Sequence, residues 1–189
     1  MPRTTTAVRR SPRRASARTA LDFLREEHAQ VSKLFKQFER FHKAEDAGGM
    51  RLCAQAACKA LKVHAQIEEE IFYPALRAAA DADDPLDEAD VEHASIKELV
   101  GQIENASPGD DHYAARVTVL SEYVRHHVGE EESTIFAKAR KADCDLTALG
   151  EQLMARKEEL GGEEPPPEVT ALAARSRIAR SRNGQRTSR

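Results

Sequence analysis

Residues 27–34 read EHAQVSKL, and residues 92–99 repeat the pattern as EHASIKEL. In both copies the histidine lies in phase with apolar residues three and four positions away, as a buried helical seam requires. His28, for example, continues a series that contains Leu24 and Val31. The repeat therefore predicts two helices of the same design, one in each half of the chain.

A second pattern follows each copy of the first. His64 and Glu68 are four residues apart, and His127 and Glu131 repeat this spacing further along the chain. Residues i and i+4 share one face of a helix and lie about 6 Å apart. Two similar helical hairpins, related by a pseudo-twofold axis, predict one up-down-up-down four-helix bundle with short loops.

The remaining sequence also indicates an all-α protein. It has few aromatic residues, no Trp and no alternating Val/Ile/Thr-rich run of the kind that predicts strands. A short amphipathic helix at about 146–160 is predicted to pack outside the bundle. Ala47-Gly48-Gly49 is predicted to separate the first two helices, and Pro74 to kink or tighten the second.

Charge divides the chain into a body and two tails. Residues 1–20 and 175–189 each contain six Arg and no acidic residue. Setting those twelve arginines aside leaves 17 Lys and Arg against 32 Asp and Glu, a net charge of −15. We therefore predict a bundle domain at 20–160, a disordered Arg-rich tail at 1–19, and a Gly/Pro linker with a disordered basic tail at 161–189.

The chain lacks the features of a membrane or secreted protein. No stretch approaches the roughly 18 consecutive apolar residues that span a bilayer, and no apolar segment follows the Arg-rich start. Three cysteines without a CxxC pair suggest neither a disulfide framework nor a thiolate zinc site. A cytoplasmic protein is the expectation.

Each of the four apolar seams is interrupted near its middle by a histidine, or by a histidine and a glutamate. Buried carboxylates without compensation cost several kcal/mol each, so these groups need partners. His–Glu hydrogen bonds with buried water are one solution, and bound metal is the other. Aligned interruptions in all four seams favour metal, and the predicted ligands are His28, His64, Glu68, His93, His127 and Glu131.

The donor types narrow the choice of metal. Imidazole and carboxylate ligands without thiolates suit iron, manganese or zinc. Six protein ligands are too many for one tetrahedral zinc ion, whereas two metal ions bridged by carboxylates fit the number. The doublet His126-His127 leaves one ambiguity, because His126 with Glu130 is an alternative pair. His127 is preferred, since it stays in phase with Val124.

These motifs together resemble the hemerythrin-like HHE cation-binding domains over roughly residues 20–142. The resemblance rests on Glu27-His28, His64-x-x-x-Glu68, Glu92-His93 and His127-x-x-x-Glu131. It implies a non-haem di-iron centre with an oxo or hydroxo bridge on the six predicted ligands. Oxygen-carrying members have a further His where this chain has Lys97, and an Asp where it has Glu131. The chain is therefore more similar to the iron-sensing and stress-related members, so oxygen carriage becomes the less favoured function.

Several neighbouring residues receive weaker predictions. Glu27 and Glu92 point about 100° away from the adjacent histidines, so solvent exposure is expected, with a hydrogen bond to a ligand as the alternative. Tyr123 lies one turn before His127 and is expected to be a core residue or a donor to the centre. The residues expected to be solvated surface charges are Glu69, Glu70, Glu130 and Glu132.

Three functions remain open from the sequence, which does not decide whether the protein is an enzyme. The leading hypothesis is a di-iron protein that handles oxygen, nitric oxide, peroxide or iron in oxidative or nitrosative stress. The second is an iron-sensing or iron-donating protein without turnover, whose folding depends on metal. The third is a metal-free interaction bundle whose tails contact nucleic acid, although no recognition pattern makes this the main role.

Overall fold

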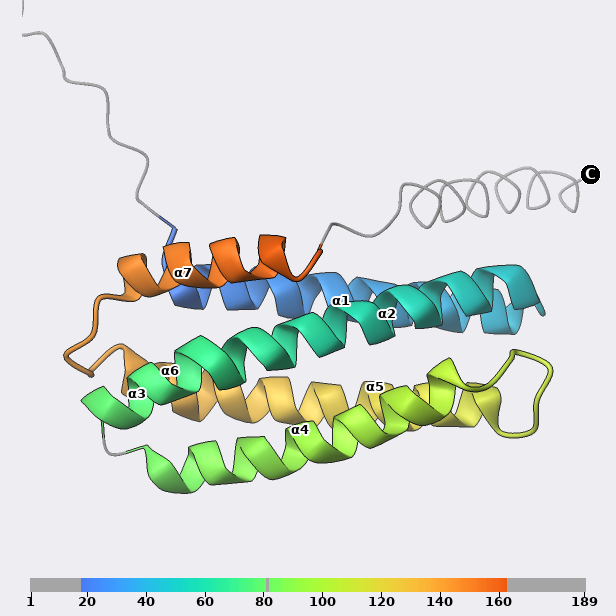
Figure 1. The fold of residues 1–189 in the computed structure, drawn as a ribbon. Helices are drawn as coiled ribbons and strands as arrows, with labels where there is room; N and C mark the ends of the chain where they lie inside the picture. The colour runs from blue at the N-terminus through green and yellow to red at the C-terminus, as the bar shows by residue number, and fades with distance from the viewer. Residues whose placement is uncertain (1–17, 81, 163–189) are drawn as a thin grey trace, which may run out of the picture.

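Four helical rods lie side by side in the computed structural model (Figure 1), which describes residues 18–80 and 82–162. Two of the rods contain more than one element, because a π-helical turn and a short final helix continue α2 and α5. Within the described ranges no strand occurs, which confirms the all-α prediction. The elements are α1 (Ala20–Lys43), α2 (Ala47–Ile67), η1 (Glu68–Phe72), α3 (Tyr73–Ala79), α4 (Asp83–Glu104), α5 (Tyr113–Glu130), η2 (Glu131–Ile135), α6 (Phe136–Ala139) and α7 (Leu146–Glu159).

The rods form two hairpins, as the repeat predicted. α1 packs against the continuous rod α2–η1–α3, and α4 packs against the rod α5–η2–α6. Contacts between α2 and α4 and between α1 and α5 join the hairpins into one four-helix bundle (Figure 1). Short connections between sequential rods are what an up-down-up-down bundle requires.

The turn between α1 and α2 differs from the predicted one. Gly48 and Gly49 lie inside the first turn of α2, and Asp46 caps the helix by accepting the Gly49 N–H at 2.9 Å. A Cβ atom at Gly49 would lie 2.2 Å from Cδ1 of Phe41, so this glycine makes room for the aromatic ring. The glycines therefore serve helix packing rather than breaking the helix.

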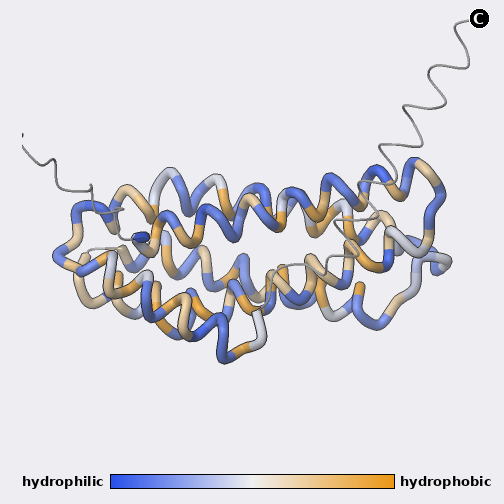
Figure 2. The backbone as a smooth tube through the Cα atoms, turned by 90° about the horizontal axis from the view of Figure 1, so that it is seen from above, coloured by the Kyte–Doolittle hydropathy of each residue, from blue (hydrophilic) through white to orange (hydrophobic). Residues whose placement is uncertain are grey.

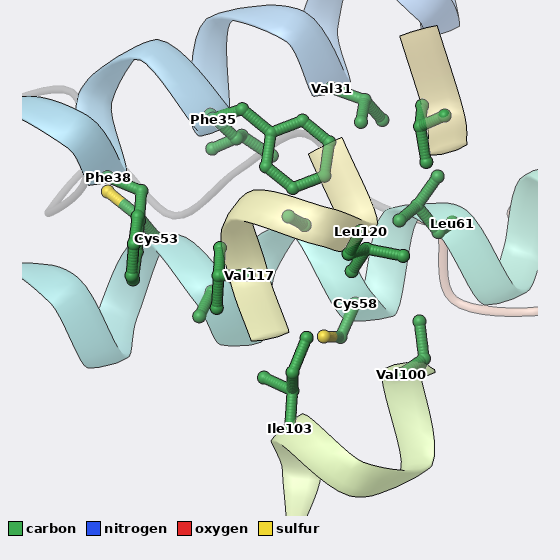
Figure 3. Packing of buried hydrophobic residues seen from close by; sticks show 14 of the residues in the cluster. Val31, Phe35, Phe38, Cys53, Cys58, Leu61, Val100, Ile103, Val117 and Leu120 are labelled. Atoms are coloured by element: carbon green, nitrogen blue, oxygen red, sulfur yellow. The ribbon is translucent and has the colours of Figure 1, made fainter. Parts of the chain in front are cut away.

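Two apolar clusters fill the bundle, and the predicted ligands lie between them along its length. One cluster (Figure 3) includes Val31, Phe35, Cys53, Cys58 and Leu120. Burial raises the pKa of both cysteine thiols to about 12, so they behave as small apolar residues. The other cluster, at the opposite end, includes Leu24, Ile67, Phe72, Leu86, Phe136 and Leu153. Figure 2 shows hydrophobic and hydrophilic residues alternating along each rod.

The additional helix α7 lies along the first hairpin only. It contacts α1, α2 and η1, and buries Leu149 and Leu153 against that end of the core. A Cβ atom at Gly150 would lie 2.8 Å from the Arg18 carbonyl oxygen, which shows how closely α7 approaches the start of α1. One side of the bundle is therefore covered by a fifth helix.

The tails predicted at 1–19 and 161–189 fall mostly outside the described residues. Thr19 is described and caps α1, since its hydroxyl accepts the Asp22 N–H while the Asp22 carboxylate accepts the Thr19 N–H. Among residues 18–80 and 82–162, no helix has the length and apolar character needed to cross a bilayer.

Candidate metal centre

All six predicted ligands are buried and come together in the middle of the bundle. α1 supplies His28, α4 supplies His93, and each of the other rods supplies a His/Glu pair. Their side chains form two groups of ligand atoms, each within 4.8 Å: His28, His64, Glu68 and Glu131 in one, and Glu68, His93 and His127 in the other. Glu68 belongs to both groups, so its carboxylate lies between the two hairpins.

The histidines pair within hairpins. Nε2 of His28 lies 3.1 Å from Nε2 of His64, and Nε2 of His93 lies 3.1 Å from Nε2 of His127. Each hairpin therefore presents two imidazole nitrogens to one point. This arrangement offers two adjacent positions for a cation, one per hairpin.

The two carboxylates lie between these imidazole pairs. Oε1 of Glu68 is 3.2 Å from Nε2 of His64, and its Oε2 is 3.4 Å from Nε2 of His93. Oε2 of Glu131 is 3.1 Å from Nε2 of His28. Within the described residues none of the four carboxylate oxygens has a hydrogen-bond partner. Buried oxygens of this kind are costly unless a proton or a cation compensates them.

Burial opposes charge in the centre, yet the His28–Glu131 contact outweighs burial for that pair, since the pKa of His28 is raised and that of Glu131 is lowered. Burial and then the nearby Glu131 carboxylate raise the pKa of Glu68 well above its ordinary value. Burial, followed by the neighbouring His28 and His93, lowers the pKa of His64 well below its ordinary value. A neutral imidazole is the form that ligates metal, and a bound cation would reverse the penalty on the carboxylates.

A π-helical turn begins at each of the two glutamates. η1 starts at Glu68 and η2 starts at Glu131, so the helix widens in both hairpins directly after the His/Glu pair. Pro74 was predicted to kink or tighten the second rod; the turn directly before it is wider than an α-helical one rather than tighter, and the kink stays a prediction. The equivalent position in the second hairpin is Ala137, so the π turn accompanies the glutamate rather than the proline. π turns inside α-helices occur frequently at functional sites.

Three further glutamates orient the imidazoles from outside. Nδ1 of His28 lies 2.9 Å from Glu132, Nδ1 of His93 lies 2.9 Å from Glu69, and Nδ1 of His127 lies 2.8 Å from Glu92. An ionised carboxylate only accepts, so each Nδ1 carries the hydrogen and each Nε2 keeps a lone pair directed at the centre. Such partners fix the tautomer and raise the basicity of a ligating histidine.

These contacts correct the prediction that Glu69 and Glu132 are solvated, and for Glu92 they favour the stated alternative, a hydrogen bond to a ligand, over solvent exposure. A helical projection places them beside the ligand face, but each reaches a histidine of a neighbouring rod. The repeat was the available signal, because glutamate recurs at the same position of both hairpins. Glu70 does lie at the surface, where it pairs with Arg156. Tyr123 is 49% exposed, so the prediction of a core residue was wrong.

The fourth histidine lacks the corresponding partner. By symmetry with Glu92 and His127, Glu27 should accept from Nδ1 of His64, yet that nitrogen has no hydrogen-bond partner within the described residues. Glu27 is buried and instead accepts from Nζ of Lys157 on α7 at 2.8 Å. The expectation that Glu27 is exposed was wrong, because sequence periodicity does not reveal what α7 covers.

The packing of α5 distinguishes the two histidines of the His126-His127 doublet. The side chain of His127 is 3% exposed and points at the centre, whereas that of His126 is 64% exposed. His126 lies 3.6 Å from Glu130, its predicted alternative partner, on the surface. The structure therefore buries both members of the preferred pair, His127 and Glu131, in the bundle core.

Comparison with known proteins agrees with this arrangement. The family model of the hemerythrin HHE cation-binding domain matches residues 19–139. A solved hemerythrin HHE cation-binding domain-containing protein from Mycobacterium kansasii has the same fold, with a TM-score of 0.64 and 22% identity over 76% of this chain and 88% of that chain.

A curated relative is longer. A DNA nickase of Nostoc sp. is 33% identical over 119 residues, which cover 63% of this chain and 33% of that protein. The chain thus spans about a third of the length of this relative. The family match covers most of the bundle, including all six predicted ligands and both π turns. The chain therefore belongs to the hemerythrin HHE cation-binding domain family.

Proposed function

We propose that the six buried residues hold two iron ions: His28, His64 and Glu131 would serve one, His93 and His127 the other, and Glu68, which belongs to both groups of ligand atoms, would contribute to both. The observation that carries this proposal is a concentration of hydrogen-bond acceptors without donors. Four carboxylate oxygens lack partners within the described residues, and three imidazoles direct Nε2 lone pairs at them. The residues therefore fit metal cations, and their nitrogen and oxygen donors suit iron.

The surroundings of the centre suit a small ligand. A cavity of about 10 Å³ is lined by all four histidines and by aliphatic side chains that include Val31, Leu61 and Ile96. That volume accommodates roughly one water-sized molecule. Two iron ions would supply redox and Lewis-acid chemistry toward oxygen, nitric oxide or peroxide. We place the protein in the handling of these molecules, or of iron itself, under oxidative or nitrosative stress.

The protein side chains have separate tasks in this proposal. The outer glutamates Glu69, Glu92 and Glu132 hold the imidazole rings and keep their Nδ1 hydrogens away from the centre. The two apolar clusters on either side exclude bulk water, which strengthens every electrostatic interaction inside. Metal sensing or iron donation without turnover uses the same ligands, so it stays the alternative.

Metal analysis with an ultraviolet–visible spectrum in air tests the proposal. We expect about two irons per chain and oxo-to-iron charge-transfer bands in the purified protein. His64→Ala and His127→Ala should lower the iron content toward one or zero, because each removes a ligand from one pair. His42→Ala is the matched control, since this histidine is exposed near the end of α1. Full iron content in both ligand variants would show that the ligands are assigned wrongly.

A second candidate function is contact with nucleic acid through the arginine-rich ends. The Nostoc relative is named a DNA nickase, and residues 1–20 and 175–189 of this chain each hold six Arg and no acidic residue. Such segments neutralise phosphates without reading sequence. We expect the full chain to bind duplex DNA in a fluorescence anisotropy assay at 50 mM salt and to weaken at least about tenfold at 200 mM. A chain truncated to 18–162 should not bind, and equal binding by both chains would disprove a role for the ends.

A further inference from the structure

Three side chains meet on the surface of α4 and α5, beside the candidate metal centre. Nε2 of His126 lies 3.3 Å from Oε1 of Glu92 and 3.6 Å from Oε1 of Glu130. The three ligand atoms lie within 4.8 Å of one another. His126 and Glu130 are four residues apart on α5, the same spacing that the buried His/Glu pairs use.

Glu92 connects this surface cluster to the buried ligands. Its Oε1 faces His126, while its Oε2 accepts from Nδ1 of His127 at 2.8 Å. Its side chain is 20% exposed, compared with 64% for His126 and 3% for His127. The Glu92 carboxylate therefore contacts both an exposed histidine and a buried ligand of the centre.

A cavity continues the connection inward. It has a volume of about 110 Å³, and its lining includes the exposed Glu130, the partly exposed Glu92 and the buried His127 and Glu131. Glu131 is 1% exposed, and neither of its carboxylate oxygens has a hydrogen-bond partner within the described residues. A buried carboxylate thus lines the same cavity as Glu92 and Glu130, two members of the surface cluster.

In the first hairpin α7 covers the corresponding surface, and a lysine neutralises the corresponding glutamate. The positions equivalent to His126 and Glu130 are Val63 and Ile67, both buried on the side covered by α7. There Nζ of Lys157 lies 2.8 Å from Oε1 of Glu27, the counterpart of Glu92. A fixed ammonium thus neutralises the outer glutamate of the first hairpin. The described contacts of Glu92 are instead to His126 and His127.

We propose that His126, Glu130 and Glu92 form a surface site that takes up a divalent first-row metal ion and delivers it through this cavity to Glu131 and His127. The inference rests on the proposed function for its destination. One imidazole and two carboxylates suit Fe²⁺, Mn²⁺ or Zn²⁺. Because His126 and Glu130 are exposed, bound metal keeps water ligands and exchanges readily. The site serves uptake, and the buried ligands serve retention.

Loading kinetics test the proposal. Metal-free full-length protein is mixed anaerobically with Fe²⁺, and uptake is followed by quenching with a ferrous chelator. We expect H126Q/E130Q to load about tenfold more slowly than wild type, because the surface site no longer attracts and binds the cation. The final iron content should be the same. E39Q/H42Q removes the same charge from exposed positions on α1 and should load at the wild-type rate. Equal rates for H126Q/E130Q and wild type would overturn the delivery route.

A second measurement separates this inference from the proposed function. Calorimetric titration with Zn²⁺ should show one weak binding event that is present in wild type and in E39Q/H42Q and absent from H126Q/E130Q. Loss of that event supports the surface site even if the buried ligands prove to hold no iron, in which case the proposed function alone fails. An unchanged titration of H126Q/E130Q overturns the surface site.

Discussion

Replacing Glu68 and Glu131 by glutamine is expected to abolish iron binding and, at the same time, to stabilise the metal-free protein. Both carboxylates are fully buried, and their oxygens lack hydrogen-bond partners within the described residues. Glutamine is neutral, and its amide can donate to the imidazole Nε2 atoms that now face acceptors. Removing two fully buried carboxylates should raise the free energy of unfolding of the metal-free chain by about 2 kcal/mol.

Thermal unfolding in excess chelator measures this gain, and metal analysis measures the loss of iron. E39Q/E122Q is the matched control, because it removes two exposed carboxylates and should change neither quantity. A gain in stability together with loss of iron is the signature of residues retained for binding at a cost in stability. Destabilisation of metal-free E68Q/E131Q would mean that the carboxylates are compensated within the protein and that metal is not required to pair them.

Removing the metal from the wild-type protein is expected to lower its melting temperature by roughly 10 °C. Binding to the native state alone contributes about 4 kcal/mol when free ligand exceeds its dissociation constant a thousandfold. In a chain of this size each kcal/mol corresponds to about 3 °C. The large shift follows from the position of the centre, because the ligands join all four rods between the two apolar clusters.

Differential scanning calorimetry of the protein with iron and after chelation checks this expectation. Mg²⁺ serves as the control cation, since it is a hard ion that binds poorly to imidazole and should leave the melting temperature of the chelated protein unchanged. Identical melting temperatures with and without iron would indicate a preformed polar core that is stable by itself. That result would favour the metal-free interaction bundle.

Much of the fold could be predicted because the same helical pattern occurs twice in the sequence. The recurrence of EHAQVSKL as EHASIKEL, with helical phase on both sides of the histidine, was sufficient to predict two hairpins. The bundle confirms that prediction, and the short helix predicted at about 146–160 is α7, Leu146–Glu159. The same helical phase brought the six candidate ligands to one place, because the apolar face of each helix packs toward the core and carries the ligands with it.

The parts that the sequence did not predict depend on contacts between rods. Helical phase places Glu69 and Glu132 beside the ligand face, but only the crossing of neighbouring rods brings them to His93 and His28. The π turns were missed for a different reason, since α-helical periodicity assumes 3.6 residues per turn throughout. A widened turn at Glu68 or Glu131 has no compositional marker that this assumption could detect.

Because α7 packs against the first hairpin, the two halves of the internal repeat have different surroundings. Lys157 puts a positive charge beside Glu27, and its field reaches His64, whose pKa it helps to lower after burial and the other histidines. The second hairpin has matching ligand types but an imidazole and a carboxylate at the surface instead of an ammonium. Two ions seated on these halves would experience different potentials, so chemically identical positions would become distinguishable. The pair would then fill in order rather than at random, with the half that is open to water occupied first.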